Sequence, residues 1–204
     1  IGYMFLALGV GAWSAGVFHF MIHAFFKALL FLGAGAVIFS VHHEHNMFKM
    51  GGLRKKLPVT FWTFLIGSAS LAALPLVTAG FYSKDQILWY VWASDQGGAG
   101  LWLAGILGAI ITAIYTFRMI FITFYGEQKS EVQHTPGMLI KIPLIVLAVL
   151  SIFGGMIDLP KNFADFNLFS KFVNNTVPAI DVHAESETME WLMQAISAVV
   201  AIGG

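Results

Sequence analysis

The scarcity of charged residues along two long stretches constrains this chain more than any other feature. Residues 1–43 contain no Asp, Glu or Arg and only one Lys, and residues 58–83 contain no charged residue. Over the whole chain 58% of residues are apolar and 11% are charged, whereas a soluble domain carries about 25% charged residues. Stretches of this length cross a hydrocarbon core of about 30 Å as helices. The sequence therefore predicts an all-α, polytopic bundle of transmembrane helices.

The apolar runs place the expected spans. We expect complete spans at residues 17–41, 101–124 and 140–157, and a fifth apolar run that begins at Trp191. The polar segment 158–190 precedes this last run. Because the chain starts and stops inside apolar runs and does not begin with Met, we expect an internal fragment of a longer protein.

The run from residue 57 to residue 93 needs a different explanation. It is too long for one straight span and too short for two spans joined by a loop. Pro75 and Gly80 interrupt it, because proline removes a backbone donor and glycine permits backbone angles that other residues avoid. Since broken helices at membrane depth line buried or wet cavities, we expect a single span broken near residues 75–85.

Loop charges predict the orientation. The loop 42–56 holds four basic residues and the region 118–141 holds three, whereas the segment 158–190 holds six acids and two lysines. Lys and Arg collect on the cytoplasmic side of membrane proteins. We therefore expect the loop 42–56 to be cytoplasmic.

Composition and motifs exclude several classes of function. The formal net charge is zero, which argues against nucleic acid as a partner. Cysteine is absent, and no phosphate-binding loop, dinucleotide fingerprint or nucleophile elbow occurs. The run His42, His43, Glu44 and His45 invites a metal site, but its position beside a helix end favours a solvated loop. We expect no metal and no bound cofactor in this chain.

Three titratable residues form a stripe in the first complete span. His19, His23 and Lys27 lie at spacing i, i+4, i+8, which places them on one helix face about 6 Å apart along the axis. A charged lysine near mid-bilayer costs about 2.5–3.5 kcal/mol, and histidine titrates near neutral pH. The stripe therefore predicts a proton relay. Two alternatives stay open: separate structural contacts, with Lys27 paired to an unseen carboxylate, or a metal site for which no third ligand is visible.

Lys84 and Asp85 form a second candidate site beside the expected break. A charged pair at an interruption of a membrane helix lies where water or an ion can reach it, as at the ion sites of transporters. Adjacent residues do not face each other on a helix, so we expect each to address a different partner. The alternative is an interfacial helix end at which Ser83 is the N-cap.

Three stretches of the sequence resemble a known family. They include His23-Ala24-Phe25-Phe26-Lys27, Lys49-Met50-Gly51-Gly52-Leu53 and Gly80-Phe81-Tyr82-Ser83-Lys84-Asp85. In this order they resemble the L subunits of bacterial respiratory complex I, which is the proton-pumping NADH:quinone oxidoreductase. These subunits are equivalent to mitochondrial subunit 5, and they belong to the antiporter-like family. The motifs cover residues 1–125, and beyond them the resemblance rests on hydropathy.

The resemblance implies a fold of two inverted five-helix repeats with broken helices. Residues 1–125 would form part of the second repeat, including the broken helix near residues 75–85, and residues 126–204 would form the following transmembrane helices.

The resemblance also implies roles for the site residues. Lys27 matches the central lysine of the proton path, and His19 and His23 match the histidines beside it. Lys84 matches the lysine at the second broken helix, the proposed exit group, and Asp85 matches its acidic neighbour.

The function implied by the resemblance is proton translocation coupled to electron transfer from NADH to quinone. The chain would be a multi-pass subunit of a bacterial inner membrane, next to another antiporter-like subunit and in contact with the lipid bilayer. NADH, FMN, iron–sulfur clusters and quinone would all bind to partner subunits. Two alternatives stay open: a subunit of a multisubunit sodium/proton antiporter, and a non-transporting scaffold whose buried charges fix helix packing.

Overall fold

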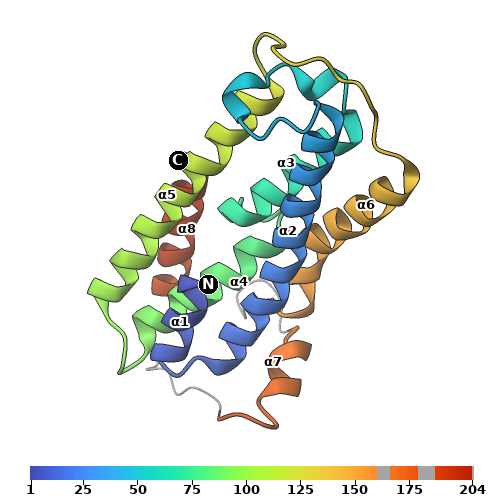
Figure 1. Cartoon of the computed structure of the whole chain (residues 1–204). Helices are drawn as coiled ribbons and strands as arrows, with labels where there is room; N and C mark the ends of the chain where they lie inside the picture. The colour runs from blue at the N-terminus through green and yellow to red at the C-terminus, as the bar shows by residue number, and fades with distance from the viewer. Residues whose placement is uncertain (160–165, 179–186, 204) are drawn as a thin grey trace.

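The computed structural model describes residues 1–159, 166–178 and 187–203 (Figure 1). Within these ranges the chain is built from helices and loops without a strand, apart from one isolated bridge between Asp158 and Asn167. The helices are α1 (Gly2–Gly9), α2 (Trp13–Ser40), α3 (Pro58–Ala72), α4 (Ala79–Ala93), α5 (Ala99–Phe124), α6 (Met138–Phe153), α7 (Leu168–Val173) and α8 (Glu187–Gly203), with single turns η1 (Met47–Lys49), η2 (Leu53–Lys55) and η3 (Gly154–Ile157). The predicted all-α bundle is confirmed for the described residues.

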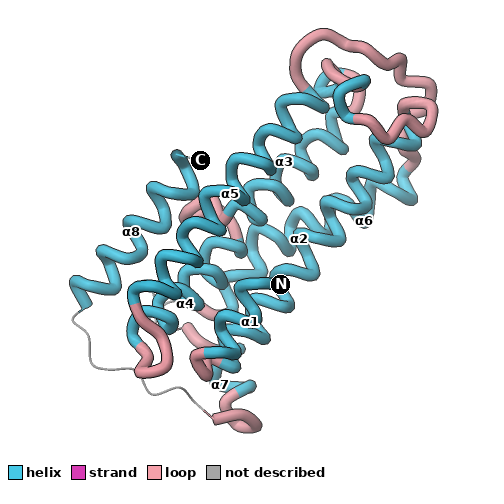
Figure 2. Tube along the Cα trace, turned by 60° about the vertical axis from the view of Figure 1, so that its left-hand side comes forward, coloured by secondary structure: helices cyan, strands magenta, loops and turns pink. Residues whose placement is uncertain are grey.

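Among the described residues, three helical segments are long and apolar enough to cross a membrane. They are α2, α5 and the continuous segment Met138–Ile157, which combines α6 with η3. In Figure 2 these segments run along the length of the molecule. The helix α2 packs against α1, α3, α4 and α6, so it forms the centre of the bundle. The spans expected at 101–124 and 140–157 are therefore confirmed as helices, and α2 begins four residues before the expected residue 17.

The interruption of the long apolar run lies between α3 and α4. Residues 73–78 are not helical, and the non-glycine residues Ala73 and Leu76 have left-handed φ angles of 62° and 64°. The helices on either side have 15 residues each, about 22 Å, which is shorter than a hydrocarbon core of about 30 Å. Pro75 lies in the interruption, as expected.

Gly80 does not interrupt the run, and the expectation that it does is wrong. It is the second residue of α4, and its role is close packing. A Cβ atom at this position would overlap the backbone carbonyl oxygen of Ser70, near the end of α3. The Gly80 N–H donates a hydrogen bond to Ser70 Oγ at 3.1 Å, so the start of α4 is fastened against the end of α3.

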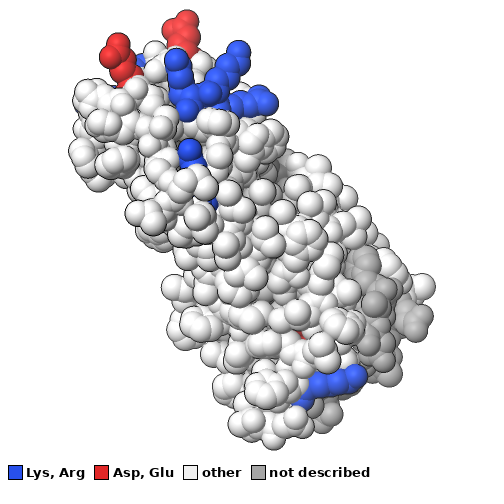
Figure 3. Space-filling view, turned by 90° about the vertical axis from the view of Figure 1, so that its right-hand side faces the viewer, with Lys and Arg blue, Asp and Glu red and all other residues white. Residues whose placement is uncertain are grey.

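Basic residues gather at one end of the bundle. The loops before α3 and after α5 meet there, because the Gly52 N–H bonds the Tyr125 carbonyl at 3.0 Å and the Gln133 N–H bonds the Ser40 carbonyl at 3.0 Å. Figure 3 shows Lys and Arg side chains at this end, with acidic side chains beside them, and a largely uncharged face between this end and a basic side chain near the opposite end. Apolar side chains such as Leu139, at 92% exposure, lie on the surface of this bundle. A lipid environment suits such a surface.

We predict that Gly80→Ala destabilises the fold and that Gly35→Ala does not. The added methyl group at position 80 meets backbone, which cannot move aside as a flexible side chain can, so the free energy of unfolding should fall by about 1–3 kcal/mol or more. At Gly35 in α2 no atom lies within 4 Å of the added Cβ, and alanine favours the helix. Reversible denaturation of the purified full-length protein measures both. Equal stability of the two variants would show that the α3–α4 contact is looser than described.

Candidate functional site

The predicted stripe on α2 is present, and its three members differ in exposure. His19 is 2% exposed, whereas His23 and Lys27 are partly buried. The ring centroids of His19 and His23 are 6.2 Å apart, and His23 packs edge-on against Phe26 at 5.2 Å. Within the described residues the Lys27 side chain forms neither an ion pair nor a hydrogen bond. The carboxylate partner considered for Lys27 is therefore not found in this part of the chain.

Lys84 occupies a fully enclosed position on α4. It is 4% exposed, and its Nζ donates a hydrogen bond of 2.7 Å to the carbonyl oxygen of Leu71 in α3. In a continuous helix this carbonyl would accept from the amide of residue 75, but residue 75 is proline and has no N–H. The carbonyl of Leu71 is thus left without a helical amide partner, and Lys84 binds it. Cations are favoured at such helix C-termini.

Ser83 joins the α2 stripe to α4. The Nδ1 atom of His19 and the Oγ atom of Ser83 are 2.9 Å apart, and both side chains are buried. Because Ser83 is the fifth residue of α4 and Thr78 is its N-cap, the alternative in which Ser83 is an N-cap at an interface is wrong. Sequence reasoning missed this contact, because it links residues 64 positions apart.

Tyr3 on α1 completes the cluster. The Nζ atom of Lys84 lies 5.1 Å from the centroid of the Tyr3 ring, and the His19 ring centroid lies 6.0 Å from it. The Tyr3 hydroxyl donates to the Gly105 carbonyl of α5 at 2.5 Å, which fixes the ring. Sequence reasoning missed Tyr3, because a tyrosine near the start of an apolar run carries no signal of its distant neighbours.

The Asp85 side chain lies towards α8, on a different side of α4 from Lys84, as expected from their adjacent positions. It is 3% exposed, and its polar neighbours are Gln194, Ser197 and Glu190, all on α8. The Oδ2 atom of Asp85 and both polar side-chain atoms of Gln194 have no hydrogen-bond partner among the described residues. The two charged neighbours on α4 therefore belong to two separate polar clusters.

The loop that follows α2 is held by its own interactions. Glu44 accepts a hydrogen bond of 2.8 Å from the Asn46 N–H and lies 3.4 Å from Lys49 Nζ. His42 and His43 adopt left-handed φ angles of 56° and 58°. Within the described residues no three side chains are grouped as a metal site would require.

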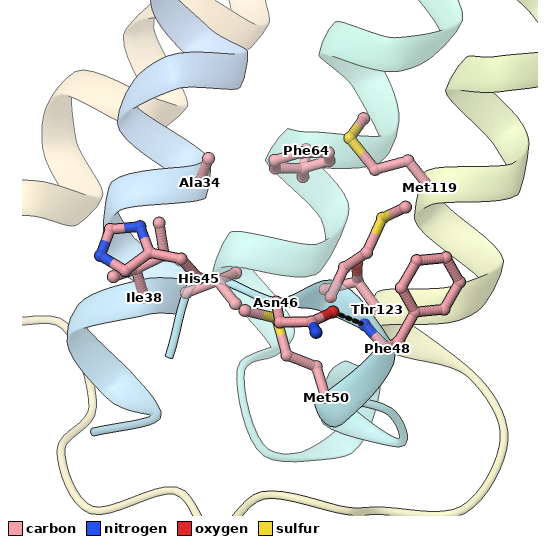
Figure 4. Close-up of a pocket in the computed structure, with 11 residues that line it drawn as sticks. Ala34, Ile38, His45, Asn46, Phe48, Met50, Phe64, Met119 and Thr123 are labelled. Atoms are coloured by element: carbon pink, nitrogen blue, oxygen red, sulfur yellow. Dashed lines mark hydrogen bonds between the residues drawn. The ribbon is translucent and has the colours of Figure 1, made fainter. Parts of the chain in front are cut away.

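An apolar cavity lies near this loop and away from the buried lysines. It has a volume of about 380 Å³, and its lining includes Ala34 on α2, Phe64 on α3 and Met119 on α5 (Figure 4). At its loop end the Asn46 side chain accepts a hydrogen bond from the Phe48 N–H at 3.0 Å. None of the predicted site residues lines it, so it is not part of the site.

Comparison with known proteins gives consistent matches. Residues 1–112 match the family described as NADH:quinone oxidoreductase/Mrp antiporter, TM. The chain is 60% identical over 160 residues to NADH-quinone oxidoreductase subunit L of Pseudomonas aeruginosa and 56% identical over 160 residues to that of Escherichia coli, in both cases covering 78% of this chain and 26% of the relative. It is 47% identical over 183 residues to that of Rickettsia conorii, covering 83% of this chain and 27% of the relative. The chain thus spans about a quarter of the length of these relatives.

We predict that Ser83→Ala lowers stability and that Ser94→Ala does not. The first change leaves His19 Nδ1 buried without its partner, and interhelical hydrogen bonds in membranes are worth about 0.6–1.7 kcal/mol. Ser94 is the C-cap residue directly after the same helix and is also buried. Its hydroxyl has no partner among the described residues, so its removal is neutral or stabilising. Thermal denaturation of the two purified full-length variants compares them. Matching losses would mean that the His19–Ser83 contact contributes nothing specific.

Proposed function

Since this chain belongs to the NADH:quinone oxidoreductase/Mrp antiporter transmembrane family, we propose that it forms part of a proton path in the membrane arm of a proton-translocating NADH:quinone oxidoreductase. The observation that carries the proposal is the 2.9 Å contact between His19 and Ser83. It connects the histidine stripe of α2 to the helix turn that holds the buried Lys84. Intramembrane ionisable residues are expensive, and they mark ion and proton pathways.

The proposed relay runs along α2 and crosses to α4. A proton moves between His23 and His19 through bridging water, because a centroid separation of 6.2 Å is too long for direct transfer. The hydroxyl of Ser83 both donates and accepts hydrogen bonds, so it can pass a proton from His19 towards Lys84. The Tyr3 ring lies against both His19 and Lys84 and shields this crossing.

The two lysines act on each other as like charges. Lys27 contributes to the electrostatic environment of Lys84, and like charges in a low-dielectric site disfavour simultaneous protonation. We therefore propose that the two lysines act as successive groups of one relay.

The redox chemistry belongs elsewhere in this proposal. NADH, FMN, iron–sulfur clusters and quinone bind to partner subunits, and the chain contributes only translocation. The relatives are bacterial proteins named as subunit L of NADH-quinone oxidoreductase, which supports a bacterial inner membrane and neighbouring membrane subunits, including a second antiporter-like subunit. The chain itself has no cysteine to ligate a cluster.

A sodium/proton antiporter subunit is the second candidate, because the family description also names the Mrp antiporter. The identities of 60% and 56% to proteins named as subunit L favour the first candidate. Proton transport that requires Na⁺ and continues without electron transfer would favour the second.

We predict that Lys27→Ala and Lys84→Ala each lower the proton-to-electron ratio while the complex still assembles. Loss of a positioned proton-transfer group slows transfer by about 10²–10⁴-fold. Proton uptake and NADH oxidation are measured together in inverted membrane vesicles that carry the full-length protein in its complex, and native gels report assembly.

Lys129→Ala is the matched control for this experiment. Lys129 is exposed and donates to the Phe48 carbonyl in the loop region at 3.1 Å, far along the chain from the site. The control should keep the parental proton-to-electron ratio. A normal ratio in both Lys27→Ala and Lys84→Ala would favour the scaffold and refute the relay.

A further inference from the structure

A small cavity lies at the basic end of the bundle, away from the proposed relay. Its volume is about 240 Å³, and it lies where the start of α3 meets the segment that leads into α6. Its polar lining consists of Lys56, Thr60, Thr135 and Lys141. The sequence analysis used these lysines only as loop charges, and the proposed relay does not need them.

Two cations from distant parts of the chain meet at this cavity. Lys56 comes directly before α3 and is exposed, whereas Lys141 lies in the first turn of α6 and is partly buried. Within the described residues neither forms an ion pair; the ion pair found at this end joins Lys49 to Glu44. A lining that includes two lysines and two threonines suits a phosphate group, whose oxygens accept hydrogen bonds from both kinds of donor.

Below the cavity the surface becomes apolar. Trp62 on α3 is 55% exposed, and it lies one turn after the cavity residue Val59. Ile142 and Ile145 on α6 are 52% and 46% exposed, one position and one turn after Lys141. Tryptophan is enriched where a bilayer meets water. Charged and apolar surfaces thus follow each other along the membrane-crossing direction.

The seam between α3 and α6 continues this apolar surface into the bundle. Ile66, one turn after Trp62, packs against the apolar cluster that includes Leu144 and Ala148 of α6. A free phosphate ion would use only the lysine end, whereas a molecule with a phosphate head and hydrocarbon chains matches both parts.

We propose that this cavity binds the phosphate of an anionic phospholipid, with the acyl chains lying along the α3–α6 seam. Lys56 and Lys141 hold the headgroup, and Trp62 and Ile145 contact the chains. The face of the molecule in Figure 3 has the same order over most of its length: basic side chains, with two acidic ones beside them, lie at one end, and a largely uncharged surface follows before a basic side chain near the opposite end. Each basic residue near the surface strengthens binding of anionic lipid several-fold.

The test uses the full-length protein in its complex, reconstituted in nanodiscs with phosphatidylglycerol that carries a photoreactive acyl chain. After irradiation, mass spectrometry locates the labelled peptides. We expect labelling of peptides that contain Trp62 and Ile145, and about a tenfold loss of labelling in the double variant Lys56→Gln/Lys141→Gln. The control Lys55→Gln/Lys129→Gln removes the same charge from the same end, outside the cavity lining, and should keep the label.

Four results would overturn the proposal. Equal labelling by a phosphatidylcholine probe would show that the headgroup charge is not recognised. Equal losses in the two double variants would show a diffuse charge effect without a site. Displacement of the headgroup by inorganic phosphate, without label along the seam, would indicate a free-anion site. Absence of label in the intact complex would mean that a neighbouring subunit covers the cavity.

A second measurement is independent of photochemistry. In delipidated detergent solution, added phosphatidylglycerol should raise the unfolding temperature of the parental complex and of the control variant. It should not do so for Lys56→Gln/Lys141→Gln, since a ligand stabilises only the state that binds it. An equal rise in all three proteins would also refute the site.

Discussion

The hydrogen bond from Lys84 to the Leu71 carbonyl is the interaction on which the candidate site depends. An ammonium group enclosed in protein needs an acceptor, and a regular helix offers none because its carbonyls are already bonded. Pro75 has no N–H to donate to the Leu71 carbonyl. The carbonyl therefore accepts from the Lys84 ammonium group instead, and both groups gain a hydrogen-bond partner. The close contact of Gly80 with Ser70 keeps the two helix ends near enough for this bond.

The site is assembled from several helices, and this determines what the sequence could predict. The α2 stripe follows from helical spacing alone, so His19, His23 and Lys27 were found without a structure. The apolar runs likewise predicted α5 and α6. Contacts between helices have no such periodic signal, which is why Ser83 and Tyr3 were missed as partners of His19 and Lys84.

The limits of the interruption could not be predicted for a related reason. Proline marked the region correctly, but the change of direction occurs at Ala73 and Leu76, which adopt left-handed φ angles. Such angles cost energy for residues with a side chain and have no sequence signature in alanine or leucine. Glycine, which does have that signature, serves here to allow close packing of two helices.

The helix α4 separates two polar environments, and this restricts any route that uses both. Lys84 points to the group formed by α1, α2 and α3, whereas Asp85 interacts with α8 and its neighbour Gln86 donates to Asp158 at 3.1 Å. Side chains of successive helix residues point about 100° apart. In the proposed relay, a proton that passes from Lys84 to Asp85 would therefore have to go around α4 through water. Among the described residues, Asp85 Oδ2 and the polar side-chain atoms of Gln194 have no hydrogen-bond partner, so they are free to bond such water, and α8 belongs to the proposed path if Asp85 does.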